Sequence, residues 1–418
     1  MADFKSRVPV KERPKAELLT IGTELVRGSV INTNAAYLGQ ELTKLGFDVH
    51  AQSACSDNAM DIKSSLRLAL ARSDVILITG GLGPTPDDIT RDTLADYFHS
   101  SLVFSPSQFK LIRRYYQKRN KAVPSIVRKE ACLPAVAKPV LNQFGIALGF
   151  LIEEKGRILI ALPGVPGELV RLFEHHVKAY LQKRFPFLRP ASVLMVKTVG
   201  LSEPAIMQKL GSSFFRIGDF QFGIYPKMAE VGIRIYSDSK RISRLLRQYV
   251  KRKLGPHIYS FSDETLIAVV SRKLVKRRWS ISVAESCTGG RLSSELTKIT
   301  GASAYFPGGV VTYSNKVKEE ILSIPPQVIS KFGAVSKQTA LAMADRVRRQ
   351  FMTTLGLAIT GIAGPAGGSH RKPIGLVHVA ICSASRSKVW EDRFIGDRGQ
   401  IQDRAVKKAL EYLWRWIR

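Results

Sequence analysis

Short hydrophobic runs alternate with amphipathic stretches along most of the chain, a pattern typical of strands separated by helices. Over residues 16–175 it predicts strands at 17–22, 48–55, 75–79 and 158–161, and helices at 34–45, 61–71 and 90–98. The run 75–79 is apolar up to its final threonine, which indicates a strand covered on both faces. These features favour an α/β fold built on a parallel sheet.

Two further stretches follow, and the first of them has a different pattern. Residues 191–260 predict a small α+β unit, with strands at 193–199 and 230–235 and helices at 203–210 and 242–254. From residue 264 the alternation returns, with strands at 279–283, 310–315, 355–360 and 374–382 and helices at 265–276, 291–300, 337–352 and 401–417. The pattern therefore predicts three structural units.

Composition restricts the class of protein. A chain of 418 residues with 45% hydrophobic residues is globular and too long for one ordinary core. No apolar run approaches the roughly 20 residues that cross a bilayer, and residues 1–15 are too polar for a signal peptide. The four cysteines, at positions 55, 132, 287 and 382, are far apart, which argues against a disulfide framework or a zinc site. We therefore expect a cytoplasmic protein.

The net charge of +30, from 64 basic and 34 acidic residues, raises the possibility of a nucleic-acid partner. The basic residues concentrate at 113–121 and 240–278. We interpret these runs as solvated helix faces. A nucleic-acid surface is the alternative, which is possible but not favoured.

The most informative segment is AESCTGG, residues 284–290, which joins the strand at 279–283 to the helix at 291–300. A strand that turns directly into a helix aims backbone N–H groups and the positive end of the helix dipole at whatever lies in front of it. The same turn places the hydroxyl of Ser286 beside the thiol of Cys287. It is thus a candidate catalytic centre, although a small-residue turn that only permits close packing is the alternative.

A serine nucleophile needs a base, and none of the polar loops contains a histidine in a suitable place. Lys318 follows the strand predicted at 310–315 and is a candidate base if burial lowers its pKa, with Tyr313 able to relay a proton. Strand ends meet along one edge of a parallel sheet, so Ser286, Tyr313 and Thr360 are expected to be neighbours. The alternative that Lys318 is an ordinary exposed lysine remains open. Cys287 is the rival nucleophile, and we expect one of the two side chains to be packed.

A second candidate site lies in the first unit, in the glycine-rich loop GGLGPTPDD at residues 80–88. Strand, glycine-rich loop and helix form an arrangement in which backbone amides approach a phosphate. Asp87 and Asp88 then suit a divalent cation shared with phosphate oxygens, although Asp88 as a helix cap is the structural alternative. Glu168, in the rigid loop at 162–168, is a further candidate for this site.

The motifs and their order along the chain resemble those of the CinA family (competence-damage-inducible protein A), and the resemblance covers nearly the whole chain. In the first unit the matching segments are GTEL (22–25), NTN (32–34), GGLGPTPDDIT (80–90) and LPGVPGE (162–168). In the third they are AESCTGG (284–290), VTYSNKVK (311–318), GAVS (333–336), TGIAGP (360–365), KPIG (372–375) and GDR (396–398).

The resemblance implies an α/β protein of three domains: a molybdopterin-binding-like domain at 14–182, a KH-type α+β middle domain at 190–260 and an α/β amidohydrolase domain at 262–418. It implies that the last domain is a nicotinamide mononucleotide deamidase that needs no cofactor. Ser286 would be the nucleophile, Lys318 the general base and Tyr313 an assisting hydroxyl. The residues expected to hold the nucleotide and the oxyanion are Thr288, Gly289, Gly290, Asn315, Thr360, Gly361, Gly364 and Arg398.

For the first domain the resemblance implies a metal-dependent ADP-ribose pyrophosphatase. Asp87 and Asp88 would be both catalytic residues and ligands of a divalent metal cation. The residues expected to bind ADP-ribose are Gly80, Gly81, Gly83, Thr85 and Glu24. The middle unit contains no GXXG loop, so clamping of a nucleic acid by this domain is not favoured.

Three positions depart from the family pattern: Ala366 and Lys316 stand where acidic residues are usual, and Gln402 where an arginine is expected. They alter charge around the pocket but spare the nucleophile and base, so we expect changed affinity rather than lost chemistry. The hypothesis is a bifunctional pyridine-nucleotide salvage enzyme acting on small nucleotides, with no membrane association and a homodimer possible by analogy. The alternatives are a competence-associated nucleic-acid-binding or ligand-sensing protein without turnover, and an enzyme with one active domain.

Overall fold

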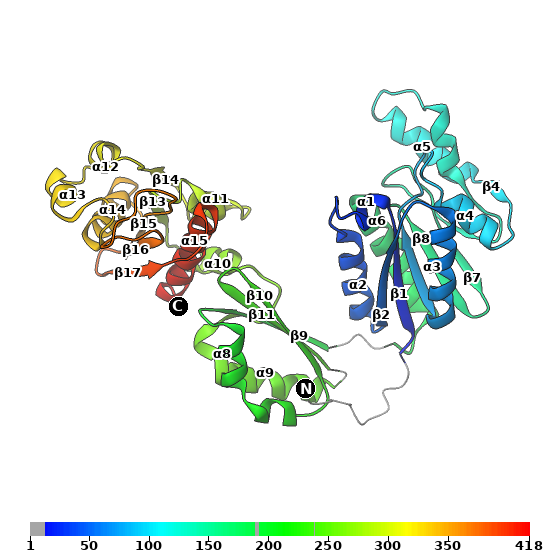
Figure 1. Ribbon diagram of the computed structural model, residues 1–418, viewed down its shortest axis with the longest axis horizontal. Helices are drawn as coiled ribbons and strands as arrows, with labels where there is room; N and C mark the ends of the chain where they lie inside the picture. Colours follow the sequence, from blue (N-terminus) through cyan, green and yellow to red (C-terminus); the bar gives the residue numbers. More distant parts are fainter. Residues whose placement is uncertain (1–12, 189–191, 238) are drawn as a thin grey trace. The chain divides into compact units, whose positions relative to one another are not determined.

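The computed structural model describes residues 13–188, 192–237 and 239–418, and the chain divides into two compact units, Met1–Ser192 and Val193–Arg418 (Figure 1). Residues 1–12, which make up most of the polar segment at 1–15, and the predicted start of the middle domain at residue 190 lie outside the described residues. No helix in the described ranges combines the length and hydropathy needed to span a membrane.

The first unit is built on a six-stranded sheet with the order β2-β1-β3-β8-β7-β6. Its strands are β1 (Lys15–Ile21), β2 (Asp48–Cys55), β3 (Val75–Thr79), β6 (Lys138–Val140), β7 (Gly149–Glu154) and β8 (Arg157–Leu162). The first four in sheet order are parallel, and β7 and β6 are antiparallel to their neighbours. The loops after β1, β3 and β8 therefore emerge along one edge of the sheet.

Helices cover both faces of this sheet. Hydrophobic clusters pack one face against α2 (Thr33–Leu45), α6 (Pro166–Leu172) and α7 (Lys178–Arg184), and the other against α3 (Ala59–Arg72) and α4 (Thr90–Tyr97). The short helix α1 (Thr23–Val26) follows β1, and α5 (Pro106–Gln117), β4 (Leu102–Phe104) and β5 (Cys132–Pro134) form a satellite layer. Local signals fix the helix ends: the Asn32 side chain accepts a hydrogen bond from Ala35 N–H, and Gly46 ends α2 with φ +101°.

The second unit begins with a four-stranded sheet in the order β10-β11-β9-β12. Its strands are β9 (Ser192–Val199), β10 (Gln221–Lys227), β11 (Glu230–Ser237) and β12 (Ile258–Ser260). The helices α8 (Glu203–Leu210) and α9 (Lys240–Leu254) contribute Ile206, Leu246 and Val250 to the hydrophobic cluster of this sheet. The sequence pattern did not predict β10, whose residues are at most half-buried and give little hydrophobic signal.

A five-stranded sheet follows, in the order β14-β13-β15-β16-β17. Its strands are β13 (Ile281–Glu285), β14 (Gly308–Val311), β15 (Leu355–Gly361), β16 (Leu376–Cys382) and β17 (Ser387–Arg393). The first three in sheet order are parallel and the last two antiparallel to their neighbours. The predicted α/β class is thus confirmed.

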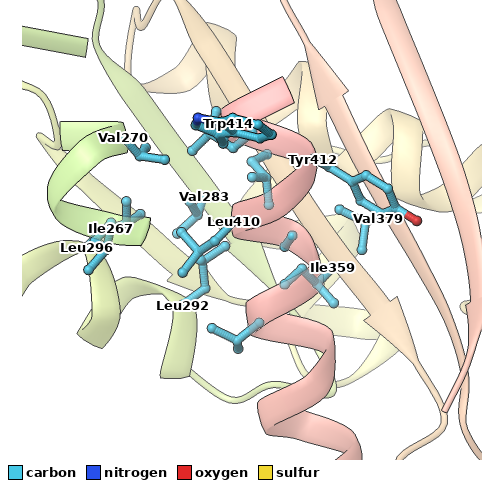
Figure 2. Packing of buried hydrophobic residues seen from close by; sticks show 14 of the residues in the cluster. Ile267, Val270, Val283, Leu292, Leu296, Ile359, Val379, Leu410, Tyr412 and Trp414 are labelled. Carbon is cyan, nitrogen blue, oxygen red and sulfur yellow. The ribbon is translucent and has the colours of Figure 1, made fainter. Parts of the chain in front are cut away.

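Two helical layers enclose this sheet. One contains α10 (Leu266–Arg277), α11 (Arg291–Thr297) and α15 (Arg398–Trp416), and the other α12 (Asn315–Leu322), α13 (Pro326–Phe332) and α14 (Lys337–Gln350). Figure 2 shows Leu410 and Trp414 of α15 packed with residues of the sheet and of α10, among them Val283 and Val270. This core fixes the carboxyl ends of β13 and β15, from which the candidate site is built.

The predicted strand at 310–315 is wrong in its second half. β14 ends at Val311, and the side chain of Ser314 accepts a hydrogen bond from Val317 N–H, which begins α12 at Asn315. Lys318 therefore projects from the first turn of a helix rather than from a loop beyond a strand.

Candidate active sites

Ser286 follows the last residue of β13 and is 7% exposed. Its main-chain N–H donates to Ile359 O (2.9 Å), which ties the turn to β15. Gly290 ends the turn with φ +96°, in the left-handed region that favours glycine, and α11 begins at the next residue. The predicted strand–turn–helix arrangement is present, and it holds the serine hydroxyl at the edge of the core.

Lys318 lies directly beside this serine: its Nζ is 3.1 Å from Ser286 Oγ. The main-chain carbonyls of Thr312 and Tyr313 accept further hydrogen bonds from the same nitrogen, at 2.7 and 3.2 Å. The side chain is 1% exposed, and burial lowers its pKa from the ordinary value. No ion pair to this lysine occurs among the described residues, so a charge on the buried amine would have only the two carbonyls and the Ser286 hydroxyl as partners.

Glu285 occupies the positive end of α11. Its carboxylate accepts hydrogen bonds from the N–H groups of Gly290 and Leu292 (3.1 and 3.0 Å) and from both the N–H and the hydroxyl of Ser293 (2.8 and 2.7 Å). The sequence predicted that such helix-terminal N–H groups, including that of Gly290, face a bound anion. That prediction is wrong for these groups, because a fully buried carboxylate of the chain already satisfies them.

Thr288 keeps donors free within the same turn. Its hydroxyl is buried without a hydrogen-bond partner in the described part of the chain, as is that of Thr312. No hydrogen bond from the Thr288 N–H to a described residue occurs either, whereas Gly289 N–H donates to Ser286 O. Thr288 is therefore the best-placed candidate to stabilise negative charge beside Ser286.

Cys287 is the packed member of the serine–cysteine pair. Its side chain is 4% exposed and belongs to the hydrophobic cluster around α15. Burial raises the pKa of its thiol to about 12, so the thiolate is scarce at neutral pH. This favours Ser286 as the nucleophile of the turn.

Tyr313 and Arg398 connect the rim of the site. Arg398, at the start of α15, donates to Gly364 O (2.7 Å) and to the hydroxyl of Tyr313 (2.6 Å). Tyr313 is 58% exposed, and within the described part of the chain its hydroxyl forms no hydrogen bond to Ser286 or Lys318. The expected proton relay through this hydroxyl is thus absent from the geometry. The side chain faces the arginine instead.

The remaining predicted binding residues surround these groups. Thr360, at the end of β15, donates its hydroxyl proton to Ala334 O (2.8 Å) and so fixes the GAVS turn. Gly361 lies where a Cβ would come within 2.7 Å of Leu376 O, and Asn315 is exposed at the first position of α12.

In the first unit, the glycine-rich loop comes directly after β3, and at two of its positions only glycine fits. Gly80 has φ +106°, and a Cβ there would lie 2.0 Å from Ile21 O; at Gly81, φ +63°, it would lie 2.1 Å from Thr90 Oγ1. No hydrogen bond from the N–H groups of Gly81 or Gly83 to a described residue occurs. The loop thus presents backbone donors in a form suited to an anion.

The two carboxylates of this loop differ in their surroundings. Asp88 accepts hydrogen bonds from the N–H (2.9 Å) and the hydroxyl of Thr85, whereas Asp87 is exposed. Asp88 does not cap α4, which starts after Ile89. Glu24 is exposed after β1 on the same edge.

Comparisons with known proteins complete the assignment. A family model described as "CinA C-terminal domain" matches residues 263–417, and one described as "Probable molybdopterin binding domain" matches residues 17–183. A competence-damage inducible protein of Caldicellulosiruptor bescii is 39% identical over 404 residues, which is 95% of this chain and 98% of that one. The chain belongs to the CinA family.

Other members of the family have similar sequence identity to this chain. The CinA-like protein of Dictyoglomus thermophilum is 35% identical over 410 residues, 96% of this chain and 99% of that protein. Among solved structures, the competence/damage inducible protein CihA of Agrobacterium tumefaciens is 38% identical, covers 36% of this chain and 94% of its own, and has a TM-score of 0.34.

The three residues of this CinA-family chain that differ from the expected motifs lie in different environments. Gln402 is buried, and its Nε2 donates to Cys287 O (2.7 Å), which holds the nucleophile turn from α15. Lys316 is exposed and pairs with Glu320 (3.6 Å), and Ala366 is exposed. The glutamine thus has a positioning contact that sequence reasoning missed.

Sequence reasoning also missed a buried charged cluster beneath the glycine-rich loop. Arg91 is 0% exposed and donates from Nη2 to Leu82 O (2.6 Å), while its Nε and Nη1 have no partner among the described residues. Glu130 is 1% exposed with an unpartnered Oε1, and Glu168 accepts a hydrogen bond from Asn142 (2.6 Å). Glu168, expected to face the site, is partly exposed, and its carboxylate contributes to raising the pKa of Glu130.

Proposed function

We propose that the C-terminal domain hydrolyses the carboxamide of nicotinamide mononucleotide to nicotinate mononucleotide and ammonia. The observation that carries the proposal is the buried amine of Lys318, 3.1 Å from the hydroxyl of Ser286. This pair supports an amide hydrolysis through a serine ester. The choice of substrate rests on the resemblance of the motifs to the CinA family.

In the first step the Ser286 oxygen attacks the carboxamide carbon while the neutral amine of Lys318 takes its proton. Burial favours the neutral amine. The carbonyls of Thr312 and Tyr313 accept hydrogen bonds from its two N–H groups, which leaves the nitrogen lone pair directed toward Ser286. The carbonyl electron pair moves to oxygen. The N–H and hydroxyl of Thr288 are the donors we assign to this oxyanion.

The tetrahedral intermediate then collapses, and the C–N bond breaks. The Lys318 ammonium returns its proton to the departing nitrogen, so ammonia leaves and the serine ester remains. Water attacks the ester with Lys318 again as the base, and the proton passes to Ser286 as the C–O bond breaks. The products are nicotinate mononucleotide and the free serine, and the amine is regenerated.

We further propose that the first domain hydrolyses the pyrophosphate of ADP-ribose. The free N–H groups of Gly81 and Gly83 would bind phosphate oxygens, with Gly80, Thr85 and Glu24 along the same edge. No group of three or more His, Cys, Asp or Glu side chains that could hold a metal occurs within the described residues. Two carboxylates fit an ion whose remaining ligands are phosphate oxygens and water, as Mg²⁺ prefers, so Asp87 and Asp88 would hold it. Such a cation would neutralise charge developing on the phosphates.

A crossed experiment tests both assignments. Nicotinamide mononucleotide should yield one ammonia per nicotinate mononucleotide formed. ADP-ribose hydrolysis should require a divalent cation and be lost in Asp88→Asn, which preserves the shape of the side chain. The same substitution should leave ammonia release unchanged, since the sites lie in separate units. Absence of either reaction in the unaltered protein would refute the corresponding assignment.

A further inference from the structure

Helix α9 (Lys240–Leu254) concentrates positive charge more than its fold requires. Its fifteen residues, KRISRLLRQYVKRKL, include seven Lys and Arg and no Asp or Glu. The helix is held to its sheet by Leu246, Val250 and Leu254, which are fully buried. None of the basic residues is among the buried residues of that core.

The charges form a single face. With about 100° per residue, six of them fall within an arc of about 140° on the side away from the buried leucines and valine. These six, here called the α9 face, are all exposed: Lys240, Arg241, Arg244, Arg247, Lys251 and Arg252. From first to last they extend about 18 Å along the helix axis.

Nothing in the described part of the chain neutralises the α9 face. None of its residues forms an ion pair with a described residue, whereas Lys197 and Arg272 of the same unit pair with Asp263 and Glu264. Arg247 lies over the ring of Phe261 at 4.5 Å, and Arg252 over that of Tyr249 at 5.2 Å.

The position of the charges is also unfavourable for the helix itself. Cations in the last turn complement the helix dipole, which accounts for Lys251 and Arg252. Lys240 and Arg241 lie at the opposite end, where the dipole repels them, and Lys240 and Arg244 form a like-charge pair four residues apart. Helix formation therefore does not explain the first half of the face.

We propose that the α9 face docks on the phosphate backbone of a nucleic acid. A row of exposed, unpaired cations matches a regular polyanion, and such contacts are independent of base sequence. An anionic membrane is the less suitable partner, because a helix that lies in a lipid surface inserts an apolar face. The apolar face of α9 is buried in its own domain, and Leu245 is its one exposed large hydrophobic residue within the described chain.

The test uses the full chain and a 30-base-pair duplex of mixed sequence, with affinity measured over a series of salt concentrations. The unaltered protein should bind with a slope of log affinity against log salt near −5, for about six phosphate contacts. In the triple variant Lys240→Gln, Arg241→Gln, Arg244→Gln the slope should become less steep by about 2.7. Its melting temperature should not fall, since the removed charges oppose the helix dipole.

The matched control is Arg113→Gln, Arg114→Gln, Lys118→Gln, which removes the same charge from exposed positions in or next to α5. This variant should retain the slope of the unaltered protein. Equal weakening by both triples would overturn the proposal, because binding would then follow net charge alone. Lack of duplex binding, or a preference for phosphatidylglycerol vesicles over the duplex, would also overturn it.

Discussion

Glu130 provides a quantitative test of the electrostatics beneath the glycine-rich loop. Burial raises the pKa of its carboxyl from 4.5 to about 7, with Arg91 opposing the shift and Glu168 and Asp88 adding to it. The folded state therefore holds this proton more tightly than the unfolded chain does. Stability consequently falls as pH rises from 4.5 to 7, and the full penalty is present above pH 7.

The size of the penalty follows from the two pKa values. One pKa unit corresponds to about 1.4 kcal/mol, so the difference is worth about 3 kcal/mol. Glu130→Gln removes the titration and keeps the shape of the side chain. It should stabilise the first unit by about 3 kcal/mol at pH 8 and by less than about 1 kcal/mol at pH 5.

Amide hydrogen exchange in peptides from β3 and β8 measures this stability in the full chain. At pH 8 the variant should open roughly 100-fold less often than the unaltered protein. The four tryptophans, Trp279, Trp390, Trp414 and Trp416, all lie in the second unit, so unfolding followed by tryptophan fluorescence should not change.

Glu154→Gln is the control, because Glu154 is exposed and its substitution makes the same change in net charge. It should leave the exchange of both peptides within a factor of about two. Faster exchange in Glu130→Gln at pH 8, or an equal gain at pH 5 and pH 8, would show that ionisation of the buried Glu130 carboxyl does not destabilise the first unit.

Three further substitutions test the C-terminal site. Lys318→Arg introduces a group that stays protonated at neutral pH and therefore cannot serve as a base, so ammonia release should fall by about 10²–10⁴, and retention of a tenth of the rate would contradict the base assignment. Glu285→Gln removes charge-assisted acceptors from the start of α11 and should cost about 2–3 kcal/mol, seen as a melting transition lower by several degrees in tryptophan fluorescence. Gln402→Leu leaves Cys287 O unpaired, so kcat should fall while KM for the nucleotide stays within about twofold; a change in KM alone would indicate a binding role.

A continuous or alternating hydrophobic pattern made the buried β3 and the half-exposed edge strand β2 predictable, whereas β7 was missed although its first four residues are buried. The apolar run at 75–79 matches β3, and the helix predicted at 203–210 matches α8. β17 was missed because its residues KVWED alternate weakly and no position in it is fully buried. A hydrophobic pattern predicts a strand where it is continuous or clearly alternating, and it gives little signal where it is neither, as in β17.

The same distinction applies to the site. The meeting of Ser286 with residues after β14 was predictable, because both follow parallel neighbouring strands. The role of Glu285 was not, since its partners are main-chain N–H groups that carry no sequence signature. The burial of Arg91 and Glu130 was equally hidden, because charged residues at such positions are indistinguishable from surface residues until the packing is known.

We propose that Ser286, activated by Lys318, is the nucleophile of an amidohydrolase. The most direct test is ammonia release from nicotinamide mononucleotide by the unaltered protein, by Ser286→Ala and by Cys287→Ala. Turnover should be abolished in Ser286→Ala and retained in Cys287→Ala. Full turnover in Ser286→Ala, or none in the unaltered protein, would contradict it.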